Sequence, residues 1–451
     1  MSTIDQIPPE YREVLIDVLV RAGERVVREI LNILRKPPGD VTDLVGNALA
    51  SMRQSQYHEA IDLLSKALQH RLGYESRGAV MLLIAQCHEN VGEWAKAEHH
   101  AREAAKQAVR ADARALHATA LNVEGVAHAQ RAELALAESL FSEALNEASH
   151  IAAPDLEAIA LANLAAVRLE RHDPGAAEQL LRTAYGLSVG DPLTAGICLV
   201  NWSVVDRRRA QSTAACNKLC KALYLFRQIG YRLGEADALA GLAILSAEVG
   251  DFVGAEGYFR RSLELSAAIG SLPRQVIACR GLARMEFISG RMEKSRELYR
   301  RALKLSRRIG DRRGVAKING ELGIVAERLG NPKQAIKCFN EALTVFSEID
   351  DPLGKAVTLA NLGSAYAELG EPETAETFLN EGLAIHAFLG NKPGEVATLV
   401  SIGRVALMRA DKAAVGEIIQ RARRLLAECV AFDPDLELLA HSVDRLESDA
   451  S

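Results

Sequence analysis

The residues of this chain whose types and spacing are best suited to chemistry are cysteines and histidines. Cys216 and Cys220 lie four positions apart, which places two thiols on one face of a helix. His88 and His128 occupy the same position in two successive copies of a repeating segment. Two thiols are half of a tetrahedral zinc site, and neighbouring helices stand roughly 10 Å apart. We therefore expect core packing for the cysteines, no metal site and no cofactor.

The sequence also lacks the motifs of common catalytic sites. It contains no phosphate-binding G-x-x-x-x-G-K-[ST] loop, no G-x-S-x-G nucleophile turn and no H-E-x-x-H zinc motif. No nucleophile, base and orienting group can be combined from its spacing. We predict that the protein is not an enzyme.

A third set of polar residues is suited to binding a peptide backbone. Asn163, Asn201 and Asn361 share one position of the repeating segment. An amide side chain offers a donor and an acceptor together, so a stacked set of amides can hold an extended peptide whatever its sequence. The alternative is that each asparagine is satisfied by the adjacent turn of its own chain segment.

The repeating segment determines how all these residues are positioned. Two tandem copies are clearest in Val315–Gly394, where each element of the first copy returns at a constant interval in the second. The matching elements are Glu321-Leu322-Gly323 with Asn361-Leu362-Gly363, Gly330-Asn331-Pro332 with Gly370-Glu371-Pro372, and Ala335 with Ala375. A fixed period of roughly 20–50 residues is typical of a solenoid. Glycine and proline punctuation between two apolar periodic stretches predicts a helix hairpin, which needs neighbours to cover its apolar faces.

One small residue in the first helix of each hairpin marks the register. The markers are Ala85, Gly125, Ala165, Ser203, Ala243, Ala283, Gly323, Gly363 and Gly403, and their numbers rise by 40 at every step except for 38 between Ala165 and Ser203. With one earlier hairpin, the pattern predicts about ten helix pairs over residues 41–430. We expect amphipathic helices in residues 1–40 and 431–451 to cap the two ends and to offer a route to self-association.

The best-preserved copy resembles a known family. Leu362-Gly363, Tyr366 and Gly370, followed by Ala375, Phe378 and Ala384, are similar to the tetratricopeptide repeat, and the long period resembles that of kinesin light chains and related polarity adaptors. The resemblance implies an all-α, right-handed superhelix whose first helices line a concave groove for protein or peptide ligands. It extends to peptide-sensing regulators of Gram-positive bacteria, which have an N-terminal helical bundle where this chain has one predicted helix.

If first helices line a groove, the marker register selects the residues that face it. These are Gln86, Asn122, Asn163, Asn201, Ile244, Arg280, Arg284, Lys317, Ile324, Asn361 and Arg404. The middle of this set combines two isoleucines with three basic side chains, which suits a partner segment that is both acidic and amphipathic.

Composition and charge limit the class of protein further. The chain has 451 residues, a net charge of −5 and 49% hydrophobic but only 5% aromatic residues, which suits stacked helices and disfavours nucleic acid as the main partner. Residues 272–318 nevertheless hold fourteen basic and four acidic side chains, a balance of +10. Seven scattered cysteines indicate a reducing compartment. No signal peptide or membrane span is visible, so we expect a cytoplasmic protein.

Together these observations predict a non-enzymatic scaffold or adaptor that binds a peptide or a helical segment of a partner in the concave groove. Two alternatives stay open. One is a regulatory subunit or ligand sensor whose superhelix changes shape and controls a separate effector. The other is anion or nucleic-acid binding through the basic residues of 272–318.

Overall fold

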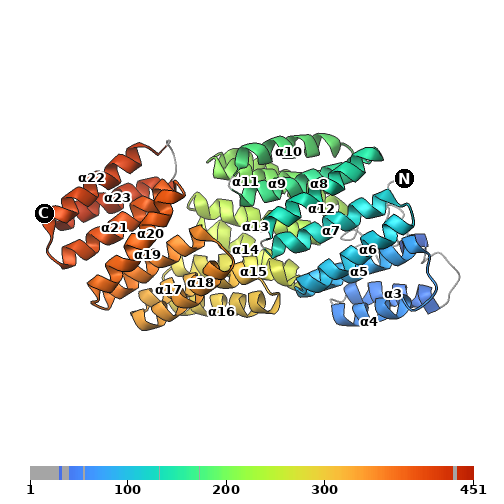
Figure 1. Ribbon diagram of the computed structural model, residues 1–451, viewed down its shortest axis with the longest axis horizontal. Coiled ribbons are helices and arrows are strands. Elements are labelled where there is room, and N and C mark those ends of the chain that lie inside the picture. The colour runs from blue at the N-terminus through green and yellow to red at the C-terminus, as the bar shows by residue number, and fades with distance from the viewer. Residues whose placement is uncertain are drawn as a thin grey trace. The chain divides into compact units, whose positions relative to one another are not determined.

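The computed structural model describes residues 30–32, 40–53, 56–131, 133–171, 173–429 and 434–450, and the regular secondary structure in these ranges is helical throughout. Figure 1 shows consecutive helices packed side by side. Helices α3 to α22 form ten successive pairs, so the predicted all-α solenoid of about ten hairpins is confirmed. The odd-numbered member of each pair is called its first helix and the even-numbered member its second helix.

The helix bounds follow the predicted period. The first five pairs are α3 (Asp40–Arg53) and α4 (Tyr57–Ala67), α5 (Tyr74–Val91) and α6 (Trp94–Arg110), α7 (Arg114–Gln130) and α8 (Leu134–His150), α9 (Pro154–Glu170) and α10 (Pro174–Leu187), and α11 (Pro192–Arg208) and α12 (Ser212–Ile229). The next five are α13 (Arg232–Glu248) and α14 (Phe252–Ala268), α15 (Leu272–Ile288) and α16 (Met292–Arg308), α17 (Arg312–Arg328) and α18 (Pro332–Glu348), α19 (Pro352–Glu368) and α20 (Pro372–Phe388), and α21 (Lys392–Met408) and α22 (Lys412–Ala427). A final helix, α23, spans Pro434–Ala450.

Short polar residues and prolines set where these helices begin. The side chain of Asn331 accepts a hydrogen bond from the Gln334 amide at 3.2 Å, and Asp351 accepts one from the Gly354 amide at 2.9 Å. Each of these caps satisfies one of the amides that a helix start leaves without a partner. Proline follows both caps, at the first helical position, where it sacrifices no internal hydrogen bond.

The one short step in the register comes from a second helix. Most helices of the array have 17 residues, whereas α10 has 14. The first helices on either side, α9 and α11, keep the usual 17 residues. The missing residues are therefore taken from a second helix, and the first helices keep their lengths.

An ion pair recurs between successive repeats. A glutamate near the start of a second helix meets an arginine just after the next first helix. The pairs are Glu98–Arg131 at 2.5 Å, Glu138–Arg171 at 2.7 Å, Glu376–Arg409 at 2.6 Å and Glu178–Arg209. An ion pair of this kind, in which both side chains are partly exposed, stabilises the fold by about 0–1 kcal/mol. The recurrence of the pair is therefore evidence for the register of the repeats and contributes little to stability.

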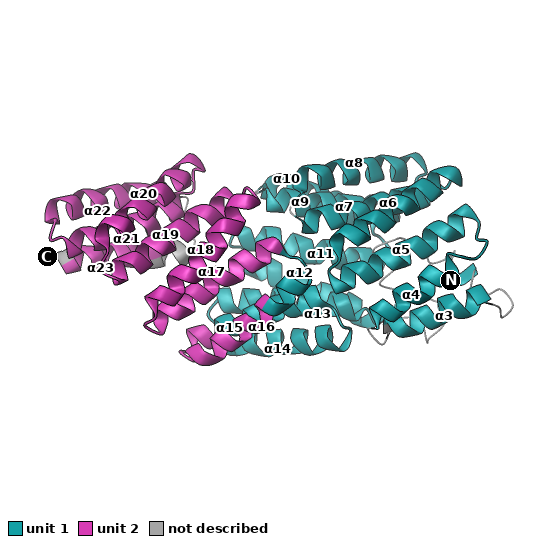
Figure 2. Ribbon diagram, turned by 60° about the horizontal axis from the view of Figure 1, so that its bottom comes forward, with its two compact units in different colours: residues 1–285, 304–311 teal, residues 286–303, 312–451 magenta. Residues whose placement is uncertain are grey.

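The chain divides into two compact units, shown in different colours in Figure 2. Unit 1 comprises residues 1–285 and 304–311, and unit 2 comprises residues 286–303 and 312–451. Each unit has its own buried core. The site described below lies entirely in unit 1.

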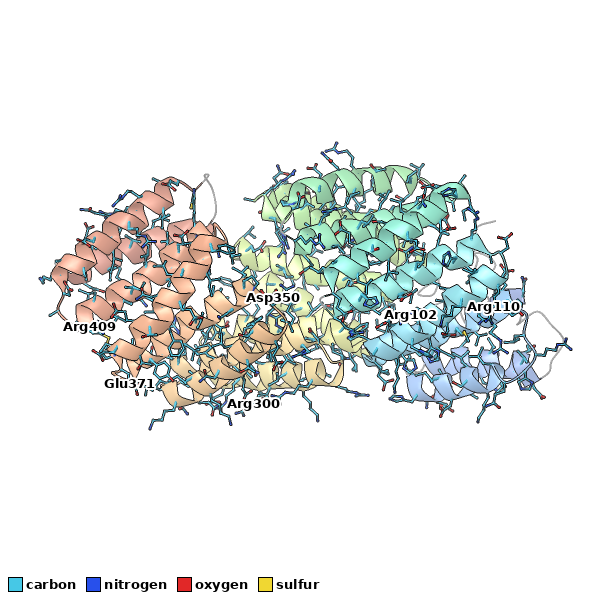
Figure 3. The ribbon with its side chains drawn as sticks, viewed as in Figure 1. Arg102, Arg110, Arg300, Asp350, Glu371 and Arg409 are labelled. Carbon is cyan, nitrogen blue, oxygen red and sulfur yellow. The ribbon has the colours of Figure 1, made fainter. Side chains whose placement is uncertain are left out.

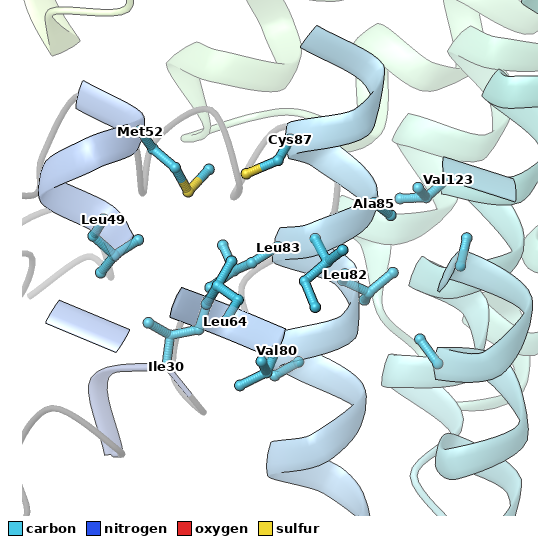
Figure 4. Close-up of a cluster of buried hydrophobic side chains, with 14 of the residues drawn as sticks. Ile30, Leu49, Met52, Leu64, Val80, Leu82, Leu83, Ala85, Cys87 and Val123 are labelled. Carbon is cyan, nitrogen blue, oxygen red and sulfur yellow. The ribbon is translucent and has the colours of Figure 1, made fainter. Parts of the chain in front are cut away.

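The core of unit 1 joins helices that are far apart in the sequence. Figure 4 shows its N-terminal part, in which Leu49, Met52 and Leu64 lie near Leu83 of α5. The same cluster continues through residues of α11, α12 and α13, including Phe226. The Tyr57 hydroxyl also donates a 2.8 Å hydrogen bond to the carbonyl of Ile269, which lies 212 residues further along the chain. The first repeats of unit 1 therefore pack directly against its last ones.

The terminal helices that were predicted as caps are described only in part. Ile30 and Leu31 are buried in the unit 1 core, while most of residues 1–40 lies outside the described ranges. In unit 2, Val443 and Leu446 of α23 are buried with residues of α21 and α22. The capping roles and the domain limits stay predictions. No described helix is both long enough and apolar enough to cross a bilayer.

Candidate functional site

Unit 1 contains a cavity of about 270 Å³, near the lower end of the range for ligand pockets. The first helices of five successive pairs, α5, α7, α9, α11 and α13, all contribute to its wall, together with the start of α15. A lining made by first helices agrees with the family resemblance, which implied that first helices face the ligand. It is confined to one unit of the array.

The wall of the cavity combines apolar and amide side chains. Its apolar part includes Val123, Val126, Ile159, Ile197 and Val200. Its amides are Asn90, Gln130, Asn163 and Asn201. An apolar wall with a few polar groups at fixed places is typical of a binding site, since the apolar part supplies affinity and the polar groups orient the ligand.

Two of the amides are held in place by hydrogen bonds. Asn90 Nδ2 donates to the Gln86 carbonyl at 3.1 Å, and Asn163 Nδ2 donates to Asn122 Oδ1 at 3.3 Å. The side chains of Asn201 and Gln130 make no hydrogen bond to any residue that the structure describes. These two are therefore the amides with the most capacity for a ligand.

A charged pair lies in the wall contributed by α13 and α15. Arg274 binds Asp237 through two nearly parallel hydrogen bonds, Nε to Oδ1 at 2.8 Å and Nη2 to Oδ2 at 2.7 Å. This two-pronged geometry is the strongest form of an arginine–carboxylate contact. With Glu89 also in the lining, the cavity wall carries two acidic groups and one basic group.

Trp94 supplies an unused hydrogen-bond donor in the same wall. Its residue is 7% exposed, and its indole nitrogen has no acceptor among the described residues. A buried donor without a partner costs about 1–3 kcal/mol. A ligand that offers an acceptor to this N–H would recover that cost.

The predicted groove residues fall into four groups. Asn163 and Asn201 line the cavity, and Gln86 and Asn122 are buried behind it as hydrogen-bond partners of the lining amides. Ile244, Arg280 and Arg284 belong to unit 1 but lie outside the lining, and Lys317, Ile324, Asn361 and Arg404 belong to unit 2. The structure therefore brings together two members of the proposed asparagine stack, and a longer groove stays a prediction.

Sequence reasoning missed Trp94, Gln130, Asp237 and Arg274. One signal was available, because Asn90 and Gln130 stand at the same distance after their markers Ala85 and Gly125. The position of Arg274 relative to Ala283 is likewise shared by Thr194 and Gly234, which also line the cavity. Two further repeat positions, that of Asn90 and Gln130 and that of Arg274, Thr194 and Gly234, thus face the cavity in addition to the asparagine position used in the prediction.

The basic residues of 272–318 are partly neutralised. At least five of them form ion pairs: Arg274–Asp237, Arg291–Glu286, Arg296–Glu293, Arg312–Glu348 and Arg313–Asp351. On α16, Arg300, Arg301, Lys304 and Arg308 are exposed. The local charge available to an anion is therefore smaller than the balance of +10 that the sequence gives.

The two cysteines of α12 have different environments. Cys216 is half-buried and packs beside the cluster around Leu219 and Leu242, whereas Cys220 is exposed. The prediction of a core position is thus wrong for Cys220, because a step of four positions exceeds one helical turn and carries the side chain over the edge of the buried face. Burial and the neighbouring Cys216 raise the pKa of the Cys220 thiol, which keeps it protonated and weakly reactive.

The histidines of α5 and α6 form a cluster that makes unit 1 sensitive to acid. The rings of His88 and His100 stack with centroids 5.3 Å apart. Burial, followed by the nearby charges of His88 and His99, lowers the pKa of His100 to about 4. Burial also lowers the pKa of His88, against the opposing effect of the hydrogen bond that His88 donates to Glu93. Both imidazoles are therefore neutral in the folded protein at pH 7.

We expect the stability of unit 1 to fall as the pH falls from 7 to 5. Below about pH 6.5 His100 is protonated in the unfolded chain, whereas in the folded protein, where its pKa is about 4, it stays neutral. The free energy of unfolding therefore decreases as the pH falls from about 6.5 towards that folded pKa. Allowing for partial solvent screening, the loss due to His100 should be about 1–2 kcal/mol at pH 5. Urea denaturation at both pH values measures this loss of stability.

His100→Gln should flatten the pH dependence of stability, and His150→Gln, at an exposed histidine, should not. Equal slopes for both variants would show that His100 is not the origin of the pH dependence.

Comparisons with known proteins agree with the fold. Two family models described as tetratricopeptide repeat match the chain, one at residues 276–348 and 314–387 and the other at residues 241–308. A search of curated proteins found no match. Among solved structures, a Rap protein complexed with Competence and Sporulation Factor has a TM-score of 0.55 at 15% identity, covering 78% of this chain and 98% of its own.

Two further solved structures are similar at lower scores. BtubC (BKLC) from P. vanneervenii is 23% identical over 51% of this chain and 93% of its own, with a TM-score of 0.42. The signal transduction ATPase PH0952 from Pyrococcus horikoshii, which has a tetratricopeptide repeat sensor, is 15% identical over 86% of this chain and 64% of its own, with a TM-score of 0.48. The repeat models and the fold shared with the Rap protein agree with the helix pairs described above. Residues 241–387 match tetratricopeptide repeat models, and together with the helix pairs these matches support a tetratricopeptide repeat superfamily protein.

Proposed function

We propose that this chain is a non-enzymatic binding protein that holds a short peptide segment of a partner in the cavity of unit 1. The observation that supports the proposal most is the pair of uncommitted amides, Gln130 and Asn201, in a wall that is otherwise largely apolar. Amides can pair with the peptide backbone, while the apolar wall takes up side chains. The volume of about 270 Å³ suits a few residues and is too small for a whole helix.

The charge of the wall indicates which segment fits. Arg274, the basic residue of the lining, is already paired with Asp237. Because an added carboxylate would have to compete with Asp237 for Arg274, we propose a neutral segment for the cavity. This differs from the acidic partner expected from Arg280, Arg284 and Lys317, which lie outside the lining. An acidic partner stays possible only for a surface outside the cavity.

A sensor role is the second candidate, and the closure of unit 1 favours it. The Tyr57–Ile269 hydrogen bond joins the first repeats to the last ones of this unit. A ligand in the space between these repeats changes the free energy of the contacts that close it, so binding and closure are coupled. The Rap protein was solved in complex with Competence and Sporulation Factor, so a chain with this fold can hold a bound factor.

The test uses peptides selected from a random library by panning against the full chain. We expect the selected peptides to bind about tenfold more weakly to Asn201→Ala, because one or two hydrogen bonds are lost. The matched control is Asn217→Ala, an exposed asparagine on α12. Isothermal titration calorimetry gives both affinities.

Tryptophan fluorescence locates the same peptides independently. The chain has two tryptophans, Trp94 in the cavity wall and Trp202, which packs against Tyr185 outside it. Binding should change the fluorescence of Trp202→Phe, in which Trp94 remains, and leave that of Trp94→Phe nearly unchanged. Peptides that bind Asn201→Ala and wild type equally, with the signal carried by Trp202, would show that the cavity is not the site.

A further inference from the structure

A second polar site lies in unit 1 between α6 and α7, outside the lining of the cavity. Glu98 of α6 and Glu124 and His128 of α7 place three potential ligand atoms within 4.8 Å of one another. Their side chains are 13%, 8% and 4% exposed. Desolvation and mutual repulsion oppose two carboxylates this deep and this close, so the pair needs a neighbouring positive charge.

The hydrogen bonds of His128 fix which ring nitrogen carries a proton. Its Nδ1 lies 2.5 Å from Glu133 Oε2. An ionised carboxylate only accepts, so Nδ1 carries the proton and donates it. A ring that carries its proton on Nδ1 presents the lone pair of Nε2, which is buried and has no hydrogen-bond partner among the described residues. A carboxylate on the opposite nitrogen is also the usual partner of a metal-binding histidine.

The distances around Nε2 distinguish a metal ion from a proton. Nε2 lies 3.7 Å from Glu98 Oε1 and 3.9 Å from Glu124 Oε1. Both distances exceed those of an N–H···O hydrogen bond. They are close to the separation of about 3.4 Å between two ligands of a tetrahedral ion with bonds of about 2.1 Å. We propose that Glu98, Glu124 and His128 bind a divalent transition metal ion of the zinc type, with water as the fourth ligand.

Two arginines complete the site and affect its affinity. Arg131 holds Glu98 Oε2 at 2.5 Å and leaves Oε1 to face His128. Arg102, which Figure 3 labels, lies with Nη2 2.5 Å from Glu98 Oε1 and 2.8 Å from Glu124 Oε1. It shares the two oxygens that the ion needs, but its side chain is 48% exposed and can turn into solvent. Arg102 is thus a competitor of the metal ion.

The neighbouring repeats provide natural comparisons. One repeat later, Arg168 takes the place of His128 and pairs with Glu138, the counterpart of Glu98. At the position of His128, the next repeat thus carries a positively charged side chain of its own, Arg168. One repeat earlier, His88 keeps the hydrogen bond to its own glutamate, Glu93, at 2.7 Å, but Ile84 stands in the place of Glu124. His88 is therefore the matched control for His128.

Titration of the tag-free full chain with Co²⁺ tests the site, because four-coordinate Co²⁺ has visible absorption bands that Zn²⁺ binding removes. We expect one Co²⁺ per chain, displaced by Zn²⁺. His128→Gln and Glu124→Gln should each weaken binding at least tenfold, and Glu133→Gln, which loosens the ring, about tenfold. Arg102→Met should tighten binding severalfold. His88→Gln and Cys216→Ser should bind as the wild type does, which excludes His88 and the Cys216 thiol as ligands.

Three results would overturn the proposal. They are no saturable Co²⁺ binding by either wild type or Arg102→Met, unchanged affinity in His128→Gln, or loss of binding in Cys216→Ser. Circular dichroism establishes that each variant is folded. If His128→Gln fails to fold, Glu124→Gln, which removes one charge and keeps the shape, decides in its place.

Discussion

Replacing Phe339 with alanine is expected to lower the free energy of unfolding of unit 2 by about 3–5 kcal/mol, the usual cost of removing a fully buried aromatic ring. Phe339 is 0% exposed and packs with Ala335, Leu362 and Ala365. Its ring also lies against the marker glycine of the same hairpin, since a Cβ on Gly323 would come within 2.4 Å of the ring. The void that Phe339→Ala leaves cannot be filled from the side of Gly323, because glycine has no side chain that could move into it.

A double substitution makes this prediction specific. Gly323→Ala alone should cost about 1–3 kcal/mol by overpacking against the ring. Gly323→Ala with Phe339→Leu recreates the buried Ala165–Leu181 combination found at the same register in unit 1. The double variant should therefore be more stable than the sum of the single effects indicates, by about 0.5–3 kcal/mol. Hydrogen exchange of α17 and α18 in the full chain measures Gly323→Ala, Phe339→Leu and the double variant; simple additivity of the two single effects would refute the contact.

Replacing Gly92 with alanine should have the next largest effect, and Gly250→Ala is its control. The backbone φ angles of the two glycines are +80° and +84°, so both variants share the cost of about 1–2 kcal/mol for a side chain in the left-handed region. A Cβ on Gly92 would lie 2.2 Å from the Ile309 Cα, whereas one on Gly250 meets nothing within 4 Å. A backbone atom has no rotamer by which to move away. We expect Gly92→Ala to lose about 1–3 kcal/mol more than Gly250→Ala.

This comparison tests the closure of unit 1. Gly92 follows α5, and Ile309 belongs to residues 304–311, which pack in the same unit. Hydrogen exchange in residues 304–311 should rise in Gly92→Ala and stay unchanged in Gly250→Ala. Equal losses of stability in the two variants would mean that the approach of Ile309 to Gly92 is not maintained in solution.

The repeat architecture could be predicted because its determinants are local. Gly330-Asn331-Pro332 ends one helix, caps the next and recurs at the same period, so pairs and register follow from the sequence. Asn163 and Asn201, which were predicted to face a groove, lie in the cavity wall, and their role in binding stays a prediction. A resemblance to one family then sufficed to predict the fold.

The extent of the cavity could not be predicted, because it depends on how many repeats are needed before the first and the last helices of its wall come together. Small rotations between successive pairs add up, and their sum brings Trp94 and Arg274 into one wall although several repeats separate them in the sequence. The same holds for the proposed metal site. The sequence paired His88 with His128 by period, whereas the carboxylates that face His128 come from Glu98 of the neighbouring second helix and from Glu124, whose counterpart one repeat earlier is Ile84.

The shortened helix α10 has a consequence for how this chain can change during evolution. Two residues are missing there relative to the other repeats, yet α9 and α11 still contribute Asn163 and Asn201 to the same cavity. A deletion in a second helix therefore leaves the ligand-facing wall intact, whereas a deletion in a first helix would rotate the lining residues that follow it in that helix by about 100° for each residue lost. Length variation among homologous chains should accordingly concentrate in even-numbered helices, and a designer who wishes to graft a loop or a reporter into unit 1 should insert it there.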